Sequence, residues 1–310
     1  MIVVASENGK VGIDIAIEIL RGGGSALDAV EAATRIVESN TNDHTVGVGG
    51  YPNILGEVEL DASIMEGTTR RAGAVGALRG YAHPVSVARQ ILEVLPHHLM
   101  LVGDGAARFA HEHDFEMTDL LTPPAEAAWR RQMAKFAAST PDHLAIGAGK
   151  SLTELSRWAT DPDKTAGTVN FLALDGDGRI ASAVSTSGWA FKYPGRLGDS
   201  PVIGAGNYCD DRFGACACTG LGEWAIRAGT ARSVVAALEY GLTLDDACGR
   251  AVADLLTIPV PAGIDADMNL VALGSAGNHA GYTTAAGSKY VWQTTDMTSF
   301  ETSLRTLVER

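Results

Sequence analysis

Apolar residues recur along the chain at two spacings, one typical of strands and one typical of helices. Residues 1–5 form an apolar run that predicts a buried strand, and residues 11–20 have the spacing of a helix that ends at Gly22-Gly23-Gly24. Ser25 with Asp28 three residues later has the form of a capping box, which predicts the start of a second helix. We expect these elements to pack in a core and to carry no chemistry.

The middle of the chain continues this series and then loses its pattern. Residues 59–65 alternate like a half-buried strand, and helical spacing follows over residues 86–95, 104–113 and 125–137. The stretch that leads to Gly167 is polar and weakly patterned, with turn-forming residues at 160–163. It is expected to be exposed, and a break there would leave a core intact.

The clearest local prediction is a β-hairpin. Residues 171–174 and 179–186 read as strands on either side of Asp175-Gly176-Asp177-Gly178, and Asp and Gly tolerate the backbone angles of a tight turn. Thr168 and Thr186 are equally distant from Asp177, so they are expected to face each other. Facing threonines are common in sheets, and this pair alone therefore predicts no activity.

Gly167 changes the interpretation of Thr168. Cleavage of the Gly167-Thr168 bond would give Thr168 both a hydroxyl and a free α-amine. An α-amine titrates near ~8, so at neutral pH it can accept the proton of its own hydroxyl. Thr168 would then be nucleophile and base in one residue, whereas the simpler interpretation is an ordinary strand threonine.

Composition and charge favour a small-molecule substrate. The 310 residues are 46% hydrophobic, enough to bury a large core in one domain or two. The net charge of −13 argues against a nucleic-acid or anionic-membrane surface. The amino terminus does not resemble a signal peptide, and no run of about 18 apolar residues predicts a membrane span. The four cysteines lack zinc spacing, so we expect a cytoplasmic protein without metal or cofactor.

Three other segments partly resemble nucleotide-binding or metal-binding sites. Residues 145–151 resemble a P-loop, but the required first glycine would fall at Leu144. His111 and His113 would face different directions on a helix, which argues against a metal site. The glycine-rich stretch 43–52 has no nucleotide-binding spacing and predicts only a loop that passes close to other backbone.

Two stretches of the second half carry candidate binding groups. In the loop 193–201, Arg196 and Asp199 either pair with each other, which contributes little if exposed, or hold the α-carboxylate and α-ammonium of an amino acid. Further on, a strand of small residues ends at Thr219-Gly220, immediately before a helix start. Such a junction is either ordinary or a place where N–H groups stabilise an oxyanion. Strand alternation makes Cys216 and Cys218 packing residues.

Taken together, these motifs resemble in order and spacing the asparaginases of the N-terminal nucleophile (Ntn) hydrolases, a family that includes glycosylasparaginases and plant-type isoaspartyl peptidase/L-asparaginases. The resemblance covers most of residues 1–252 and fades over the last sixty or so. It is carried by Gly23-Gly24-Ser25-Ala26-Leu27-Asp28-Ala29-Val30-Glu31, Asp61-Ala62-Ser63-Ile64-Met65-Glu66-Gly67, Ala72-Gly73-Ala74-Val75-Gly76-Ala77, Gly167-Thr168-Val169, Thr186, Pro194-Gly195-Arg196-Leu197-Gly198-Asp199-Ser200-Pro201, Gly204-Ala205-Gly206 and Ala217-Cys218-Thr219-Gly220.

The resemblance implies an α/β fold, the four-layer αββα sandwich, formed by one domain over residues 1–310. The precursor would cut itself between Gly167 and Thr168 into an α-chain, 1–167, and a β-chain, 168–310. Two such α/β units would pair as a homodimer.

The resemblance also assigns roles to single residues. Thr168 would be the nucleophile, Thr186 would support its hydroxyl, and Thr45 would lie near its α-amine. Arg196 and Asp199 would bind the α-carboxylate and α-ammonium of the substrate. The Thr219 hydroxyl and the Gly220 N–H would form the oxyanion hole.

The implied reaction is hydrolysis of a β-aspartyl amide, and the leaving group stays open. The segments 43–50 and 101–104 resemble glycosylasparaginases best, but Glu7 stands where these usually have an aromatic residue. Gly167 is as in plant-type asparaginases, whose initial His-Gly-Gly run is absent here. An N-acetylglucosaminylamine is the first expectation, ammonia or an amino acid the second, and an uncut binding protein on the same scaffold is the rival of another class.

Overall fold

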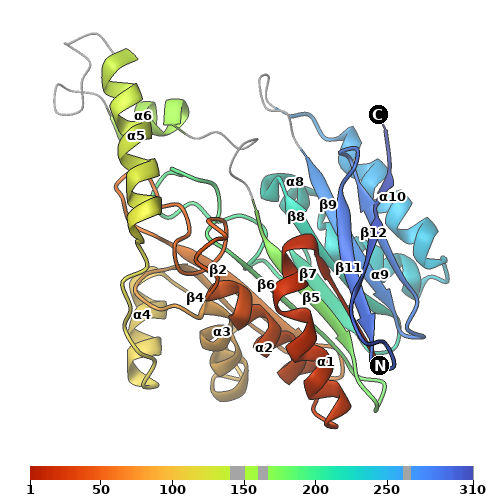
Figure 1. The fold of residues 1–310 in the computed structure, drawn as a ribbon. Coiled ribbons are helices and arrows are strands. Elements are labelled where there is room, and N and C mark those ends of the chain that lie inside the picture. Colours follow the sequence, from red (N-terminus) through yellow and green to blue (C-terminus); the bar gives the residue numbers. More distant parts are fainter. Residues whose placement is uncertain (140–150, 160–166, 261–266, 310) are drawn as a thin grey trace.

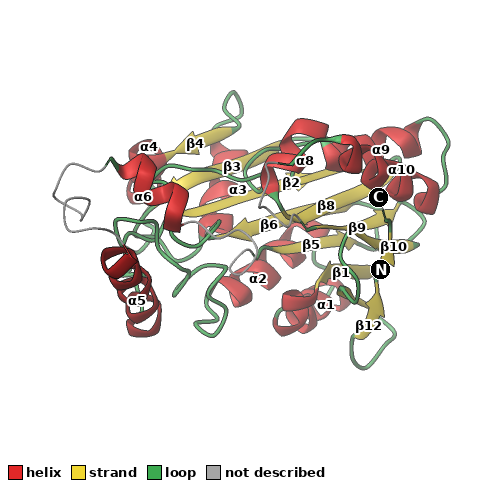
Figure 2. Ribbon diagram, turned by 90° about the horizontal axis from the view of Figure 1, so that it is seen from above, coloured by secondary structure: helices red, strands yellow, loops and turns green. Residues whose placement is uncertain are grey.

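A computed structural model describes residues 1–139, 151–159, 167–260 and 267–309. Two β-sheets pack face to face, and helices cover the outer face of each (Figures 1 and 2). This is the four-layer αββα arrangement. The predicted turns at 160–163 and most of the stretch 145–151 lie outside the described residues.

The larger described sheet has eight strands and is antiparallel except for its last pair, β3 with β4. Its order in space runs from the carboxyl-terminal strands, through the amino-terminal strand, to the central hairpin. The strands in that order are β12 (Glu301–Leu304), β11 (Lys289–Thr294), β1 (Ile2–Ser6), β5 (Val169–Leu174), β6 (Ile180–Thr186), β2 (Leu60–Glu66), β3 (Ala72–Leu78) and β4 (Met100–Val102).

The smaller sheet comes entirely from the second half of the chain. Its order is β13 (Thr306–Leu307), β10 (His279–Thr283), β9 (Met268–Gly274), β8 (Gly214–Gly220) and β7 (Asn207–Asp210). The last sixty residues, where the sequence motifs fade, thus supply strands to both sheets.

Helices of the first half cover the larger sheet and helices of the second half cover the smaller one (Figure 1). The first group is η1 (Glu7–Val11), α1 (Ile13–Arg21), α2 (Ala26–Glu38), α3 (Pro84–Val94) and α4 (Gly103–Glu112). The second group is α8 (Gly222–Ala228), α9 (Thr230–Glu239) and α10 (Leu244–Thr257). The remaining two, α5 (Pro123–Ser139) and α6 (Leu152–Ala159), project from one end of the sandwich.

Three apolar clusters hold these layers together. One lies between the first helices and the larger sheet, one between the two sheets, and one beneath α8, α9 and α10. Cys216 and Cys218 belong to the third cluster, which confirms them as packing residues. All four cysteines are free and buried, and burial raises the thiol pKa of Cys209 and Cys248 above its ordinary value. Cys209 and Cys248 are therefore poor nucleophiles.

Several local predictions are confirmed and one is wrong. Ser25 caps α2, accepting from the Asp28 N–H at 3.1 Å, as the capping box predicted. The helix predicted at 11–20 begins instead as the 3₁₀ turn η1 and continues as α1. The strand predicted as half-buried at 59–65 is β2, which is buried on both faces because a layer of helices covers one side and the second sheet the other.

The arm formed by α5 and α6 rests on the loop between α2 and β2. The Trp129 indole N–H donates to the carbonyl oxygen of Ile54 at 3.2 Å, and a small apolar cluster that includes Phe191 surrounds this contact. The arm therefore contacts the loops at this end of the sandwich, beside the glycine-rich stretch 43–52.

Candidate active site

The hairpin has the predicted register. β5 and β6 pair from Val169 opposite Ser185 to Leu174 opposite Ile180, and one further step along the ladder places Thr168 opposite Thr186. Thr168 itself is only 9% exposed. The start of β5 lies at the same edge of the sandwich as the end of β8 and the start of α8 (Figure 1). This edge brings together the candidate residues of both sheets.

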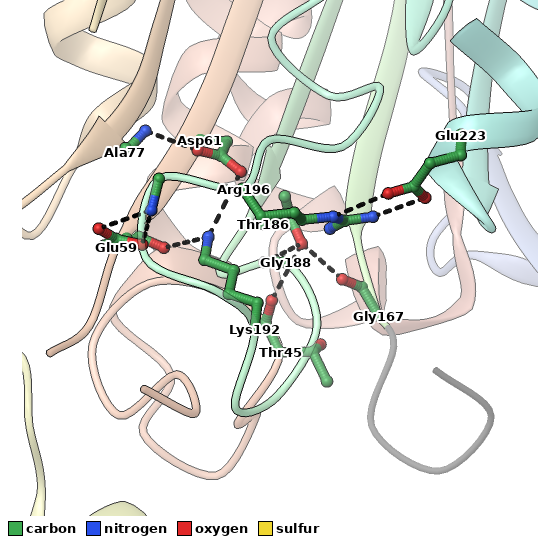
Figure 3. A network of polar contacts seen from close by, with 11 residues as sticks. Thr45, Glu59, Asp61, Ala77, Gly167, Thr186, Gly188, Lys192, Arg196 and Glu223 are labelled. Atoms are coloured by element: carbon green, nitrogen blue, oxygen red, sulfur yellow. Dashed lines mark hydrogen bonds and ion pairs between the residues drawn. The ribbon is translucent and has the colours of Figure 1, made fainter. Parts of the chain in front are cut away.

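Thr186 belongs to a short chain of hydrogen bonds that ends on Gly167. The Gly188 N–H donates to the Thr186 hydroxyl at 3.0 Å, and that hydroxyl donates to the Gly167 carbonyl oxygen at 2.7 Å (Figure 3). The carbonyl oxygen of Thr45 is a second acceptor at 3.3 Å. The shorter distance favours Gly167, so the donor faces the carbonyl of the bond between Gly167 and Thr168. A donor in this position stabilises negative charge on that oxygen.

Thr45 packs directly against Gly167. A Cβ added to Gly167 would lie 2.3 Å from Thr45 Oγ1 and 2.5 Å from Thr45 Cβ, so only glycine fits without displacing this residue. Asp43 fixes Thr45 in turn: one carboxylate oxygen accepts from the Thr45 hydroxyl at 2.5 Å and from its N–H at 2.9 Å. Asn8 donates to the other oxygen at 3.0 Å. Asn8 and Asp43 were not predicted as site residues from the sequence, although the spacing of Asp43 and Thr45 suits such a turn.

Arg196 is paired, but not with Asp199. Its Nε and a terminal nitrogen donate to the two carboxylate oxygens of Glu223 on α8 at 3.0 and 2.8 Å, and its guanidinium lies 4.0 Å from the ring centroid of Trp189 (Figure 3). The first interpretation of the sequence, a pair between Arg196 and Asp199, is therefore replaced by a forked pair with Glu223. The Arg196 guanidinium thus already binds one carboxylate through two parallel hydrogen bonds.

Asp199 lies beside this pair and is buried. It is 3% exposed, and its Oδ2 has no hydrogen-bond partner among the described residues. Burial raises the pKa of Asp199 to about 7, while the charge of Arg196 opposes this shift. A buried acceptor without a donor suits a cationic ligand, because an ammonium would supply the missing hydrogen bond and charge.

The turn after β8 approaches the same group. Thr219 is 8% exposed at the end of the strand, and Gly220 follows it with φ +123°. A Cβ on Gly222 would lie 2.8 Å from Asp199 Oδ1, so the start of α8 touches Asp199. The fold thus places Thr219 and Gly220 next to the Arg196 and Asp199 loop.

The two groups of candidates meet at Gly188. A Cβ there would lie 3.4 Å from a terminal nitrogen of Arg196, and the Gly188 N–H is the donor to Thr186. Two buried residues that were not predicted as site residues from the sequence, Asp61 and Lys192, lie beside this junction (Figure 3). Each of the predicted site residues therefore falls in one region of the molecule.

The described residues contain no group of three or more His, Cys, Asp or Glu side chains arranged to hold a metal ion. His113 is the residue that follows α4, with its ring 4.4 Å from that of Phe109. Among the described helices, none is both long and apolar enough to cross a membrane.

Comparison with known proteins shows similarity to asparaginases over most of the chain. A family model described as Asparaginase matches residues 9–301. An N(4)-(Beta-N-acetylglucosaminyl)-L-asparaginase of Elizabethkingia miricola is 36% identical over 268 residues, which are 86% of this chain and 73% of that protein. An Isoaspartyl peptidase/L-asparaginase of Rattus norvegicus is 40% identical over 234 residues, 76% of this chain and 65% of that protein. An Isoaspartyl peptidase of Salmonella typhimurium is 39% identical over 242 residues, 77% of this chain and 73% of that protein.

Proposed function

This chain belongs to the asparaginase family of Ntn hydrolases, which are amidohydrolases, and we propose that it is an autoprocessed threonine enzyme that hydrolyses the β-amide of asparagine derivatives. The observation that carries the proposal is the hydrogen bond from Thr186 to the Gly167 carbonyl oxygen at 2.7 Å. It puts a donor on the carbonyl that self-cleavage would attack.

Self-cleavage begins when the Thr168 hydroxyl oxygen attacks the Gly167 carbonyl carbon. Negative charge develops on the Gly167 oxygen, where the Thr186 hydroxyl and its donor Gly188 stabilise it. The hydroxyl proton passes to the Thr168 nitrogen as the C–N bond breaks, which leaves Gly167 as an ester on the Thr168 oxygen and frees the α-amine of Thr168. Water hydrolyses this ester and yields chains 1–167 and 168–310.

The free α-amine then serves the second reaction. It takes the proton of the Thr168 hydroxyl as the oxygen attacks the side-chain amide carbon of the substrate. The Thr219 hydroxyl and the Gly220 N–H stabilise the oxyanion, and the proton passes to the departing amine. The β-aspartyl ester left on Thr168 is hydrolysed by water, which releases aspartate and restores the enzyme.

Arg196 and Asp199 select substrates with a free α-carboxylate and α-ammonium. The forked pair of Arg196 with Glu223 is the geometry in which a guanidinium binds a substrate carboxylate. A bound substrate therefore replaces Glu223 at Arg196. Asp199 Oδ2, which has no hydrogen-bond partner among the described residues, accepts a hydrogen bond from the α-ammonium.

We propose an N-acetylglucosaminylamine as the first leaving group. The match to the glycosylasparaginase-named relative spans 86% of this chain, compared with 76% for the rat isoaspartyl peptidase/L-asparaginase. The rings of His44 and Tyr51 stack at 5.0 Å in the loop that carries Thr45. Aromatic rings beside the nucleophile would offer an apolar surface to a sugar.

An isoaspartyl dipeptide or asparagine is the second candidate, favoured by Glu7. This exposed carboxylate begins η1, next to Asn8, which reaches Asp43 behind Thr45. A charged group there suits a polar leaving group better than a sugar surface.

A direct comparison of substrates separates these functions. N4-(β-N-acetylglucosaminyl)-L-asparagine, a β-aspartyl dipeptide and L-asparagine are supplied to the processed protein, and released aspartate is measured. The highest kcat/KM identifies the leaving group. Release of aspartate from none of them, by a chain that stays uncut, would support the rival binding protein and end the proposal.

The proposal also includes a homodimeric assembly and a cytoplasmic location. A homodimer of α/β units rests on the family resemblance, and light scattering at a size-exclusion column tests it. A cytoplasmic location rests on the four reduced, buried cysteines, which suit a reducing compartment.

A further inference from the structure

A lysine side chain is buried beneath the site. Lys192 is 1% exposed, and its Nζ donates to the carbonyl oxygen of Glu59 at 3.2 Å and lies 3.7 Å from Asp61 Oδ2 (Figure 3). None of the steps described above uses it. A buried ion pair is a weak source of stability, because desolvation offsets the attraction of the charges. Stability alone therefore does not explain why this ion pair is buried at this position.

Asp61 connects the lysine to Thr186. It is fully buried on β2 and is the cross-strand neighbour of Thr186 on β6. Its Oδ1 accepts from the Ala77 N–H at 2.7 Å, and its Oδ2 has no hydrogen bond within the described residues, so Lys192 is the cation that balances it. Without that charge, a bare carboxylate would lie beside the strand that carries Thr186.

The aliphatic part of Lys192 supports Gly188. A Cβ on Gly188 would lie 3.0 Å from Lys192 Nζ and 3.2 Å from its Cδ, so the lysine packs against this glycine. Gly188 has φ +74° and donates to the Thr186 hydroxyl at 3.0 Å. Lys192 thus touches both neighbours of Thr186, its hydrogen-bond donor and its cross-strand partner.

Carboxylates outnumber cations around Gly188 and Lys192. Four carboxylates, Glu59, Asp61, Asp199 and Glu223, lie near two cations, Lys192 and Arg196. The negative charge of Asp61 contributes to the raised pKa of Asp199, and Glu223 does the same. Loss of a cation from such a group makes every neighbouring group hold its proton more tightly.

We propose that Lys192 is a positioning residue, whose side chain holds Gly188 and thereby the Thr186 hydroxyl, and whose charge balances Asp61 beneath the substrate site. This inference rests on the proposed function. In the proposed mechanism, Lys192 makes no contact with the substrate and acts only through Gly188, Asp61 and Thr186.

A charge cycle tests the proposal, with three variants: Lys192→Met, Asp61→Asn and the double variant. Asparagine retains the oxygen that accepts from Ala77, so Asp61→Asn changes mainly the charge. Lys289→Met, at an exposed position on β11, is the matched control. For each protein, the rate of self-cleavage and the pH profile of kcat/KM are measured.

We expect Lys192→Met to lower kcat and the rate of self-cleavage about ten-fold, with a smaller change in KM, because the Thr186 donor loses its support. The acid limb of the profile moves up by about one pH unit, because the α-amine of Thr168 and the carboxyl of Asp199 both lose a nearby cation. Asp61→Asn moves the acid limb to lower pH, and the double variant has an acid limb close to that of the parent protein. Lys289→Met leaves it in place.

If the acid limbs of the parent and of the three variants coincide, the proposal is overturned. A role in packing alone would lower the melting temperature but would not move the acid limb in opposite directions for the two single variants. If Lys192→Met does not fold, Asp61→Asn and the charge-balanced double variant decide the same question. The pKa of Asp199, followed by carbon NMR of labelled protein, gives an activity-free reading in which Asp61→Asn must lower it. A parent protein without self-cleavage or hydrolysis refutes the proposed function instead, so the two failures are distinct.

Discussion

The hydroxyl of Thr186 donates to the carbonyl oxygen of Gly167 at 2.7 Å, one residue before the threonine that faces it across the hairpin. The donor is aimed at the peptide bond rather than at the Thr168 hydroxyl. Under the proposed function, Thr186 would therefore serve self-cleavage first in the uncut chain. After cleavage the same hydroxyl would become available to Thr168.

Replacing Thr186 by valine should slow self-cleavage by about a hundred-fold, since one oxyanion donor is worth about two to three orders of magnitude in rate. Thr186→Ser keeps the hydroxyl and is the matched control, expected within about ten-fold of the parent. The measurement is the fraction of cut chain against time. Equal rates for the valine and serine variants would show that the hydroxyl has no part in the cleavage.

Replacing Gly167 by alanine should also impair self-cleavage, for a steric reason. The new methyl group would lie 2.3 Å from Thr45 Oγ1, so Thr45 or the scissile bond must move. Gly105→Ala is the control, because a Cβ at Gly105 in α4 meets nothing within 4 Å. Rapid cleavage of Gly167→Ala would mean that this contact does not set the geometry of the bond.

The two threonines and Gly167 could be located from the sequence because local turn chemistry fixes a hairpin. The Asp-Gly turn sets the register, and the register sets which residues face each other. The capping box at Ser25 is predictable for the same reason, since its contacts are made within four residues.

Contacts between distant segments could not be read in this way. Glu223 holds Arg196 from a helix of the other layer, and Lys192 balances Asp61 from a loop more than a hundred residues away in sequence. The double burial of β2 was missed because its polar residues, Asp61 and Ser63, alternate with apolar ones but are buried and hydrogen bonded. An alternating pattern shows which residues are polar, but it does not show whether a polar residue is buried or exposed.

Glu223→Gln should tighten the binding of L-aspartate, the expected product, to processed protein. The neutral side chain competes less well for Arg196, and the loss of its charge lowers the pKa of Asp199. We expect the Kd to fall by about three-fold to ten-fold, measured by calorimetry at pH 7. Weaker binding in this variant would mean that Glu223 itself contacts the ligand and would contradict simple competition. Glu239→Gln, which loses a surface pair with Arg232, is the control.

The affinity for L-aspartate should depend on pH through Asp199. Because burial raises the pKa of this carboxyl to about 7, it is largely protonated below that pH and cannot pair with an ammonium. Affinity should therefore fall up to ten-fold per unit as the pH drops below about 7, and should be level just above it. Asp199→Asn should bind more weakly at pH 8 and show no such dependence. A parent protein with level affinity from pH 5 to 8 would refute the role of Asp199.

Self-cleavage before Thr168 can be tested by the intact mass of the purified protein under denaturing conditions. We expect two fragments, residues 1–167 and 168–310, with Thr168 as a new amino terminus, and a single uncut chain for Thr168→Ala. A parent protein that remains one chain of 310 residues after prolonged incubation would refute self-cleavage, and cleavage of the Thr168→Ala variant at the same bond would refute Thr168 as the nucleophile.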